Sequence, residues 1–139
     1  MVSDKDGDTV RFNITNNTQS SSILELGKHK ELFPGIRYVD SETRTTSTID
    51  TIMKNTNLDG RVDFLSIDIQ GAELLALKGA VDTLERTDAL LLEINEVEMY
   101  RDCALVQEVD DYLSGYGIER VETGFYKDHP WGDALYVRT

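Results

Sequence analysis

The stretch FLSIDIQGAELLALKGA, residues 64–80, constrains the fold most, because a short apolar run changes within four residues into a helical pattern. The apolar run fits a buried strand that ends at Ile67. Apolar residues at three- and four-residue spacing after Ala72 fit one face of an amphipathic helix. Gly71 suits the tight turn between the two, because it has no Cβ. The segment predicts a strand, a turn and a helix, with the carboxylate of Asp68 at the strand tip.

Strand and helix patterns alternate over residues 61–139, which predicts a layered α/β sheet with crossover helices. The last two strands are joined by a short loop and should pair as an antiparallel hairpin. The almost unbroken apolar run 89–95 is typical of a parallel strand covered on both faces. The predicted strands are 62–67, 89–95, 118–125 and 134–137, and the predicted helices are 72–86 and about 105–114.

Residues 1–60 differ, since they are rich in Ser, Thr, Asn and Gly over most of their length. They predict a meander or insertion with little core of its own, with strands at 9–14 and around 36–39 and a short helical turn before Pro34. Asp50 stands where a helix N-cap would lie, ahead of a short helix that should end near Asn57 or Gly60. With 139 residues, a single domain is expected over 1–139.

Ligands of open α/β sheets bind beyond the carboxyl ends of the parallel strands, so the side chains there are the candidate site. The residues that leave the two parallel strands are Asp68, Asn95 and Glu96. The closing strand is reversed and begins at the same edge, which adds three residues: His129, Trp131 and Asp133.

Several carboxylates also have a structural interpretation. Asp68, Gln70 or Glu73 could satisfy the free N–H groups at the start of the helix. Glu93 lies in an apolar strand, where a carboxyl should be partnered, although burial is also how a general base acquires a raised pKa. Both interpretations stay open from the residues alone.

The remaining reactive side chains give weaker signals. His29 and His129 fit loop or capping positions better than ligand positions, so no metal site is predicted. Trp131 fits a plug under a loop as well as a substrate platform. Cys103 is the only cysteine, at the start of a helix, and is interpreted as packing.

Charge and motif content exclude several classes of function. The net charge of -12 predicts no nucleic-acid partner and no membrane partner. With one cysteine, no apolar run of about 20 residues and a polar amino terminus, a cytoplasmic location is expected. The chain has neither G-x-G-x-x-G nor a P-loop, and no G-x-S-x-G.

The same segments resemble the FkbM family of methyltransferases over the whole chain. FLSIDIQGAELLALKGA is similar to a family segment close to DFLKIDVEGAELEVLKGA, with Ser66 where Lys is usual and Gln70 where Glu is common. LLLEINEVEMYRDCALVQEVDDYLSGYGIERVET resembles the second strand and helix, and HPWGDALYVRT the closing strand. VSDKDGDTVRFNI, SSSIL and STIDTIM resemble the family's middle section in order.

This resemblance implies a Rossmann-like class I fold and methyl transfer from S-adenosylmethionine, typically to oxygen in a sugar or natural product. Asp68 would orient the acceptor hydroxyl or the cofactor amine, with Gln70 on the cofactor side and Asn95 as a second catalytic candidate. The acceptor, a small molecule or glycan, would contact Glu96, His129, Trp131 and Asp133.

The family's Gly-rich cofactor turn precedes the segment that VSDKDGD resembles. The resemblance therefore predicts a partial Rossmann-like methyltransferase sheet, the family's carboxyl-terminal portion. Two alternatives remain: an inactive remnant that serves binding or oligomerisation, and one subunit of a split enzyme. An exposed sheet edge predicts a homo-oligomer or a partner chain that supplies the missing half.

Overall fold

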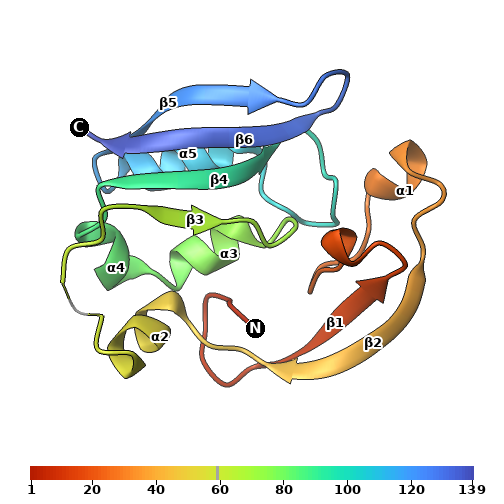
Figure 1. Ribbon diagram of the computed structural model, residues 1–139, viewed down its shortest axis with the longest axis horizontal. Coiled ribbons are helices and arrows are strands. Elements are labelled where there is room, and N and C mark those ends of the chain that lie inside the picture. The colour runs from red at the N-terminus through yellow and green to blue at the C-terminus, as the bar shows by residue number, and fades with distance from the viewer. Residues whose placement is uncertain (59) are drawn as a thin grey trace.

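The computed structural model describes residues 1–58 and 60–139, which form an antiparallel ribbon and a four-stranded sheet (Figure 1). The ribbon consists of β1 (Thr9–Thr15) and β2 (Tyr38–Thr45). The sheet has the order β3 (Leu65–Ile67), β4 (Ala89–Asn95), β6 (Trp131–Arg138) and β5 (Ile118–Phe125). The predicted α/β class is confirmed, with mixed rather than purely parallel pairing.

The four-stranded sheet combines parallel and antiparallel pairs. β3 pairs parallel with β4, and β6 pairs antiparallel with both β4 and β5. The predicted closing hairpin is therefore confirmed, although β6 starts at Trp131, earlier than the predicted 134. In this topology the carboxyl ends of β3 and β4 and the start of β6 meet at one edge of the sheet, because Asn95 is paired with Trp131.

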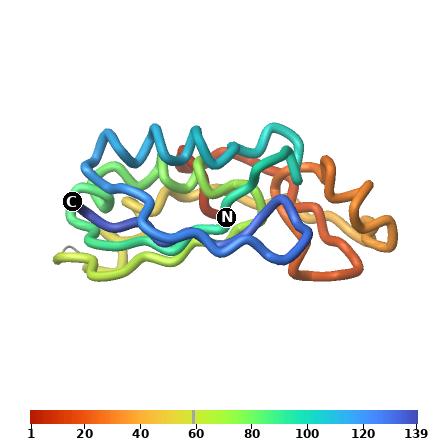
Figure 2. The backbone as a smooth tube through the Cα atoms, turned by 90° about the horizontal axis from the view of Figure 1, so that it is seen from above, coloured from red at the N-terminus to blue at the C-terminus, as the bar shows by residue number. Residues whose placement is uncertain are grey.

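The main core lies on one face of the sheet. Along β4, the fully buried Leu90 and Leu92 alternate with Leu91 and Glu93, which are only half-buried. The buried residues of β4 pack against α3 (Glu73–Lys78), α4 (Val81–Glu85) and α5 (Val106–Ser114) in one cluster. α5 runs along one side of the sheet (Figure 2). The prediction that strand 89–95 is covered on both faces holds only in part, because fully buried residues on one face alternate with half-buried residues on the other.

The single helix predicted over 72–86 is two helices, α3 and α4, broken at Gly79 and Ala80. A Cβ at Gly79 would lie 2.3 Å from the carbonyl oxygen of Ser3, so the amino-terminal segment packs directly against the break. The carbonyl of Gly79 accepts a hydrogen bond from the backbone N–H of Asp50 at 3.0 Å. Residues far away in sequence therefore contact the chain at the point where the helical pattern breaks.

Asp50 caps a different helix from the one predicted. α2 (Ile49–Asn55) begins after Thr48, whose hydroxyl accepts the N–H of Thr51 at 3.1 Å. The Asp50 carboxylate instead accepts the N–H groups of Asp82 and Thr83, at 3.0 and 2.8 Å, at the start of α4. The predicted N-cap role within the Asp50 helix is wrong, since the side chain reaches across to its neighbour.

The other predicted elements are confirmed with shifted bounds. The helical turn before Pro34 is α1 (His29–Leu32), a short 3-10 turn spans Thr18–Ser20, and β2 starts at Tyr38 rather than 36. The predicted strand 62–67 shortens to β3, with Val62 in an isolated bridge to Thr87. Cys103 is buried and lies before α5 rather than in its first turn, which is consistent with a packing role.

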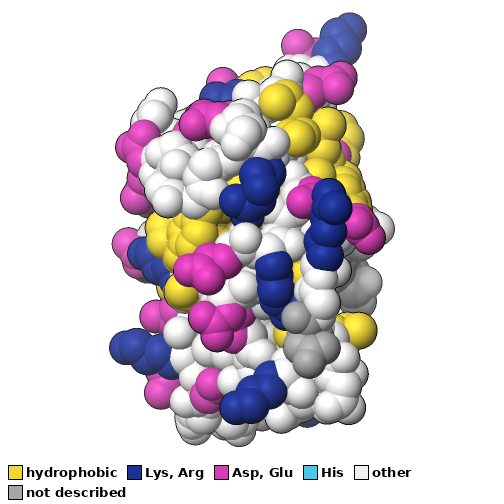
Figure 3. Space-filling view, turned by 90° about the vertical axis from the view of Figure 1, so that its left-hand side faces the viewer, with side chains coloured by type: hydrophobic (Ala, Val, Ile, Leu, Met, Phe, Trp, Pro, Cys, Tyr) yellow, Lys and Arg dark blue, Asp and Glu magenta, His cyan; other side chains and the backbone are white. Residues whose placement is uncertain are grey.

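β3 forms one edge of the sheet, and the amino-terminal ribbon lies on that side of it (Figure 1). Apolar residues near this edge are exposed, among them Phe64 at 54% and Leu58 at 55%. Figure 3 shows one end of the molecule, where apolar patches lie between acidic and basic side chains. Self-association or pairing with a partner chain through this region stays a prediction. In the part of the chain that the structure describes, each helix is too short or too polar to cross a bilayer.

Candidate functional site

A cleft of about 790 Å³ lies at the carboxyl ends of β3 and β4. The amino-terminal part of the chain forms one of its walls, through residues that include Phe12, Ser20 and Ile36. Most of the predicted site residues line this cleft: Asp68, Gln70, Asn95, His129 and Trp131. Glu96 is exposed and Asp133 half-buried, and neither is among the described lining residues.

Gln70 joins the segments that build the cleft. It follows β3 in a left-handed conformation, with φ of 58°, and Gly71 follows with φ of 94°, so the chain reverses direction at once. The side-chain amide of Gln70 donates to Asp68 Oδ1 at 2.7 Å and to Glu93 Oε2 at 3.1 Å. The Tyr100 hydroxyl donates to Gln70 Oε1 at 2.7 Å. Gln70 is thereby fixed between β3, β4 and the segment that contains Tyr100.

The amino-terminal wall is attached to the same turn. The Ser22 hydroxyl donates to the backbone carbonyl of Gln70 at 2.7 Å. The Tyr100 hydroxyl lies 3.3 Å from the backbone carbonyl oxygen of Ser20. These bonds connect residues 48 and 80 positions apart, which explains why sequence patterns did not place the wall at the cleft.

Three carboxyl groups gather at the cleft, since oxygens of Asp68, Glu73 and Glu93 lie within 4.8 Å of one another, and Asp68 and Glu93 line it. Glu73 is 3% exposed, and its Oε1 accepts the N–H groups of Ile69 and Gly71 at 2.9 and 3.2 Å. Glu73 therefore has the structural role that the sequence allowed, holding the turn rather than capping the helix. Because Glu73 is engaged with backbone and Gln70 bridges the other two, the cluster is not assigned as a metal centre.

Burial and mutual repulsion set the protonation of this cluster. Burial raises the pKa of Glu73 to about 7. The pKa of Glu93 rises to about 8, mainly through burial and further through the negative charges of Asp68, Glu73 and Asp133. The hydrogen bond from Gln70 lowers the pKa of Glu93, but only in part. Near pH 7 the Glu93 carboxyl therefore holds a proton that a bound cation or a rise in pH would release.

This raised pKa predicts that the protein loses stability between about pH 5 and pH 8. The folded state keeps the Glu93 proton above its ordinary pKa of 4.5, so the stabilisation is complete below 4.5 and disappears as the pH rises through about 8. Urea unfolding at both pH values should show a loss that is larger in the parent than in Glu93→Gln, by roughly 1–3 kcal/mol. Glu85→Gln, a change at an exposed residue of α4, controls for the lost charge. Equal losses in parent and Glu93→Gln would contradict the prediction.

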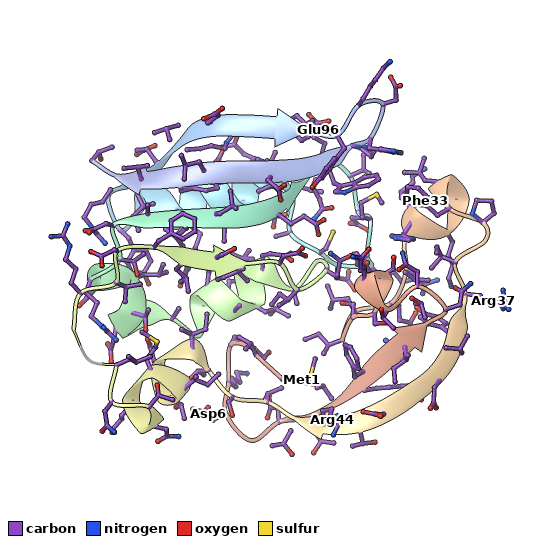
Figure 4. All side chains as sticks on the ribbon, viewed as in Figure 1. Met1, Asp6, Phe33, Arg37, Arg44 and Glu96 are labelled. Atoms are coloured by element: carbon purple, nitrogen blue, oxygen red, sulfur yellow. The ribbon has the colours of Figure 1, made fainter. Side chains whose placement is uncertain are left out.

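Aromatic side chains form another wall of the cleft. Trp131 at the start of β6 lies 4.2 Å from the His129 ring and 5.5 Å from the Phe33 ring, between centroids. The Tyr126 ring lies 6.0 Å from Trp131, and its hydroxyl donates to Asp133 Oδ2 at 3.0 Å. Phe33 follows α1, as labelled in Figure 4, so this wall joins the amino-terminal part to the closing hairpin. Trp131 is thus both a packed side chain and a lining residue.

Sequence patterns did not identify three residues of this site: Tyr100, Phe33 and His29. His29 is 7% exposed, packs between Phe33 and Tyr100, and lines the cleft. In the described part of the chain, its Nδ1 is the one buried side-chain polar atom without a hydrogen-bond partner. Burial lowers the pKa of His29, which favours the neutral form of the ring. Its predicted role as a loop or capping residue is wrong, because α1 turns the ring inward.

Comparison with known proteins gives one family. Residues 2–119 match the family model described as the methyltransferase FkbM domain. Neither the curated proteins nor the solved structures contain a match to the chain. The matched range includes the turn at Gln70, the carboxyl cluster and the amino-terminal wall, whereas His129 and Trp131 lie beyond it.

Proposed function

The chain belongs to the FkbM methyltransferase family, and on that premise we propose that it transfers a methyl group from S-adenosylmethionine to a hydroxyl group of a small-molecule or glycan acceptor. The observation that carries the proposal is the cleft at the carboxyl ends of β3 and β4, where open α/β sheets bind their ligands. It brings together residues from β3, β4, the closing hairpin and the amino-terminal wall. We also propose that the sheet is one part of a Rossmann-like methyltransferase sheet.

The residues that line the cleft suit part of the S-adenosylmethionine molecule. The cleft combines apolar and aromatic side chains with the carboxylate of Asp68, which suits a ligand with an adenine ring and an amino group. The unpartnered nitrogen of His29 adds one polar contact for a ligand. When bound, the cofactor would supply an electrophilic methyl group. Asp68 and Gln70 are the residues proposed to face its amino group.

Positioning is the main task of the protein in a transfer of this kind. The acceptor oxygen must lie in line with the methyl group, in a site that excludes water. Asp68 is proposed to accept the hydrogen bond of the acceptor hydroxyl and then its proton. Gln70 occupies Oδ1 of Asp68, which leaves Oδ2 for the acceptor. Asn95, 3% exposed at the end of β4, is proposed as the second positioning residue.

The remaining rim residues differ in how they are placed relative to the cleft. His129 and Trp131 line the cleft and are proposed to cover the acceptor. Asp133 contributes its charge to the cluster and its hydrogen bond to Tyr126. Glu96 is exposed beyond the end of β4 (Figure 4), so a contact with acceptor would require a long molecule.

The proposal predicts that S-adenosylhomocysteine, the reaction product, binds with a Kd on the order of micromolar in isothermal titration, the usual range for an intact substrate site. Asp68→Asn should weaken binding about ten-fold, a loss of ~1.4 kcal/mol, because it removes a charge-assisted bond. Asp63→Asn changes a side chain that is 90% exposed and should bind like the parent. Absence of binding at millimolar ligand in the folded parent would contradict the proposed function.

A further inference from the structure

Carboxyl groups line the cleft, and that of Glu93 becomes charged when its proton is released. Asp68 and Glu93 are lining residues, and no lysine or arginine is among the described residues that line the cleft. The amino group of Met1, also a lining residue, donates to the carbonyl oxygen of Thr45 at 3.0 Å. Asp133 and Glu73 lie close enough to Glu93 to raise its pKa further. An anionic acceptor would be repelled here, and a cation would relieve the repulsion.

The aromatic wall suits the same kind of ligand. Trp131, Phe33 and Tyr126 present ring faces and edges around one space, with centroid separations of 5.5 and 6.0 Å from Trp131. Aromatic rings attract organic cations through their negative faces. Aromatic rings beside carboxyl groups favour an organic ammonium ion over an inorganic cation. The inorganic cation would have to lose its hydration shell to contact the rings.

A third observation points to a ligand independently of charge. His29 Nδ1 is buried without a hydrogen-bond partner in the described part of the chain, and His29 lines the same cleft. A buried polar atom of this kind is costly unless a ligand or water satisfies it. A neutral imidazole nitrogen can bond a hydroxyl group, so the cleft offers a site for a hydroxyl as well as for a cation.

We propose that the acceptor carries a protonated amine in addition to its hydroxyl group, and that the Glu93 carboxyl, beside Asp68, binds the ammonium group while Trp131 and Phe33 cover the carbon skeleton. The inference rests on the proposed function, since it names the acceptor class for the same site. His29 contributes the contact to a hydroxyl group. Neutral sugars and anionic compounds of the same shape are discriminated against.

The test uses three transparent probes of one shape: trans-4-aminocyclohexanol, trans-4-methylcyclohexanol and trans-4-hydroxycyclohexanecarboxylate. They carry a positive charge, no charge and a negative charge. Trp131 is the only tryptophan of the chain, so its fluorescence reports binding in the cleft directly. We expect the amine to bind at least about ten-fold more tightly than the methyl compound, and the carboxylate to bind most weakly, as an acidic aromatic site requires.

Variants separate charge recognition from general binding. Glu93→Gln should reduce the preference for the amine at least about three-fold, because one carboxyl is lost, whereas Glu85→Gln on α4 should leave it unchanged. His29→Leu should weaken all three probes by a similar factor. Equal affinities of amine and methyl compound in the parent would overturn the proposal. Displacement of the amine by Mg²⁺ at submillimolar concentration would also overturn it, since the cluster would then be a metal site.

The proposed methyl transfer and the proposed amine acceptor are tested independently, so either one can be contradicted without the other. The probe series needs no cofactor, whereas S-adenosylhomocysteine titration needs no acceptor. If the cofactor product binds and the amine preference is absent, the amine acceptor is wrong and methyl transfer stands. If the amine preference holds and S-adenosylhomocysteine does not bind, the cleft recognises amines but the assignment of the amine as methyl acceptor is overturned.

Discussion

Replacing Leu92 with alanine is expected to lower the free energy of unfolding by about 2–5 kcal/mol, as measured by urea denaturation. Leu92 is fully buried in the middle of β4, paired with Ile67 of β3 and Ala134 of β6. It belongs to the cluster in which α3, α4 and α5 meet the sheet. Truncation removes buried methyl groups and leaves a cavity that the packed helices and strands around it cannot easily close.

The adjacent residue provides the control. Leu91→Ala changes the same residue type on the opposite face of β4, where the side chain is only half-buried. Its cost should be about 1 kcal/mol, since less apolar area leaves water on folding. Equal losses for the two variants would contradict a core that lies on one face of the sheet, and would restore the prediction of a strand covered on both faces.

Replacing Gly71 with alanine is expected to damage both stability and the cleft. Gly71 has φ of 94°, which an L side chain rarely adopts, and a Cβ there would lie 2.9 Å from Cδ2 of Tyr100. The strain should cost about 1–3 kcal/mol. Because Tyr100 must shift, its hydrogen bond to Gln70 should weaken and release the amide that holds Asp68 and Glu93.

Two measurements check this expectation. Urea unfolding reports the stability loss, and quenching of Trp131 fluorescence by S-adenosylhomocysteine or by the amine probe reports the cleft. Gly35→Ala is the matched control, because a Cβ at Gly35 would have no atom within 4 Å. Its effect on stability should stay within about 0.5 kcal/mol. Unchanged stability and unchanged binding in Gly71→Ala would show that the turn tolerates a side chain and does not set the cleft geometry.

The local patterns of the sequence were sufficient for the fold class and for the location of the cleft. The apolar run 89–95 is β4, and the predicted strand 118–125 is β5, because both have continuous strand patterns between clear turns. The strand directions predicted that Asp68, Asn95 and Trp131 lie at one edge of the sheet, and all three line the cleft there.

What could not be predicted depends on contacts between distant residues. Ser3 packs against the break at Gly79, and the capping residue of α4 lies on α2. Tyr100 and Ser22 both reach Gln70, and His29 lines the cleft from a segment that looked like a loop. A polar or small residue gives no local signal for such a partner. The sequence shows the residue types, but it does not show which distant residues contact each other.

The reciprocal contact between α2 and α4 makes two short helices into one cooperative unit. Asp50 donates its backbone N–H to Gly79 just before α4, and its carboxylate binds the first free N–H groups of that helix. Neither helix exceeds seven residues, a length that is marginal in isolation. Local opening of α2 should therefore uncap α4, because the capping carboxylate of Asp50 belongs to α2. We therefore expect the two helices to open together rather than one after the other.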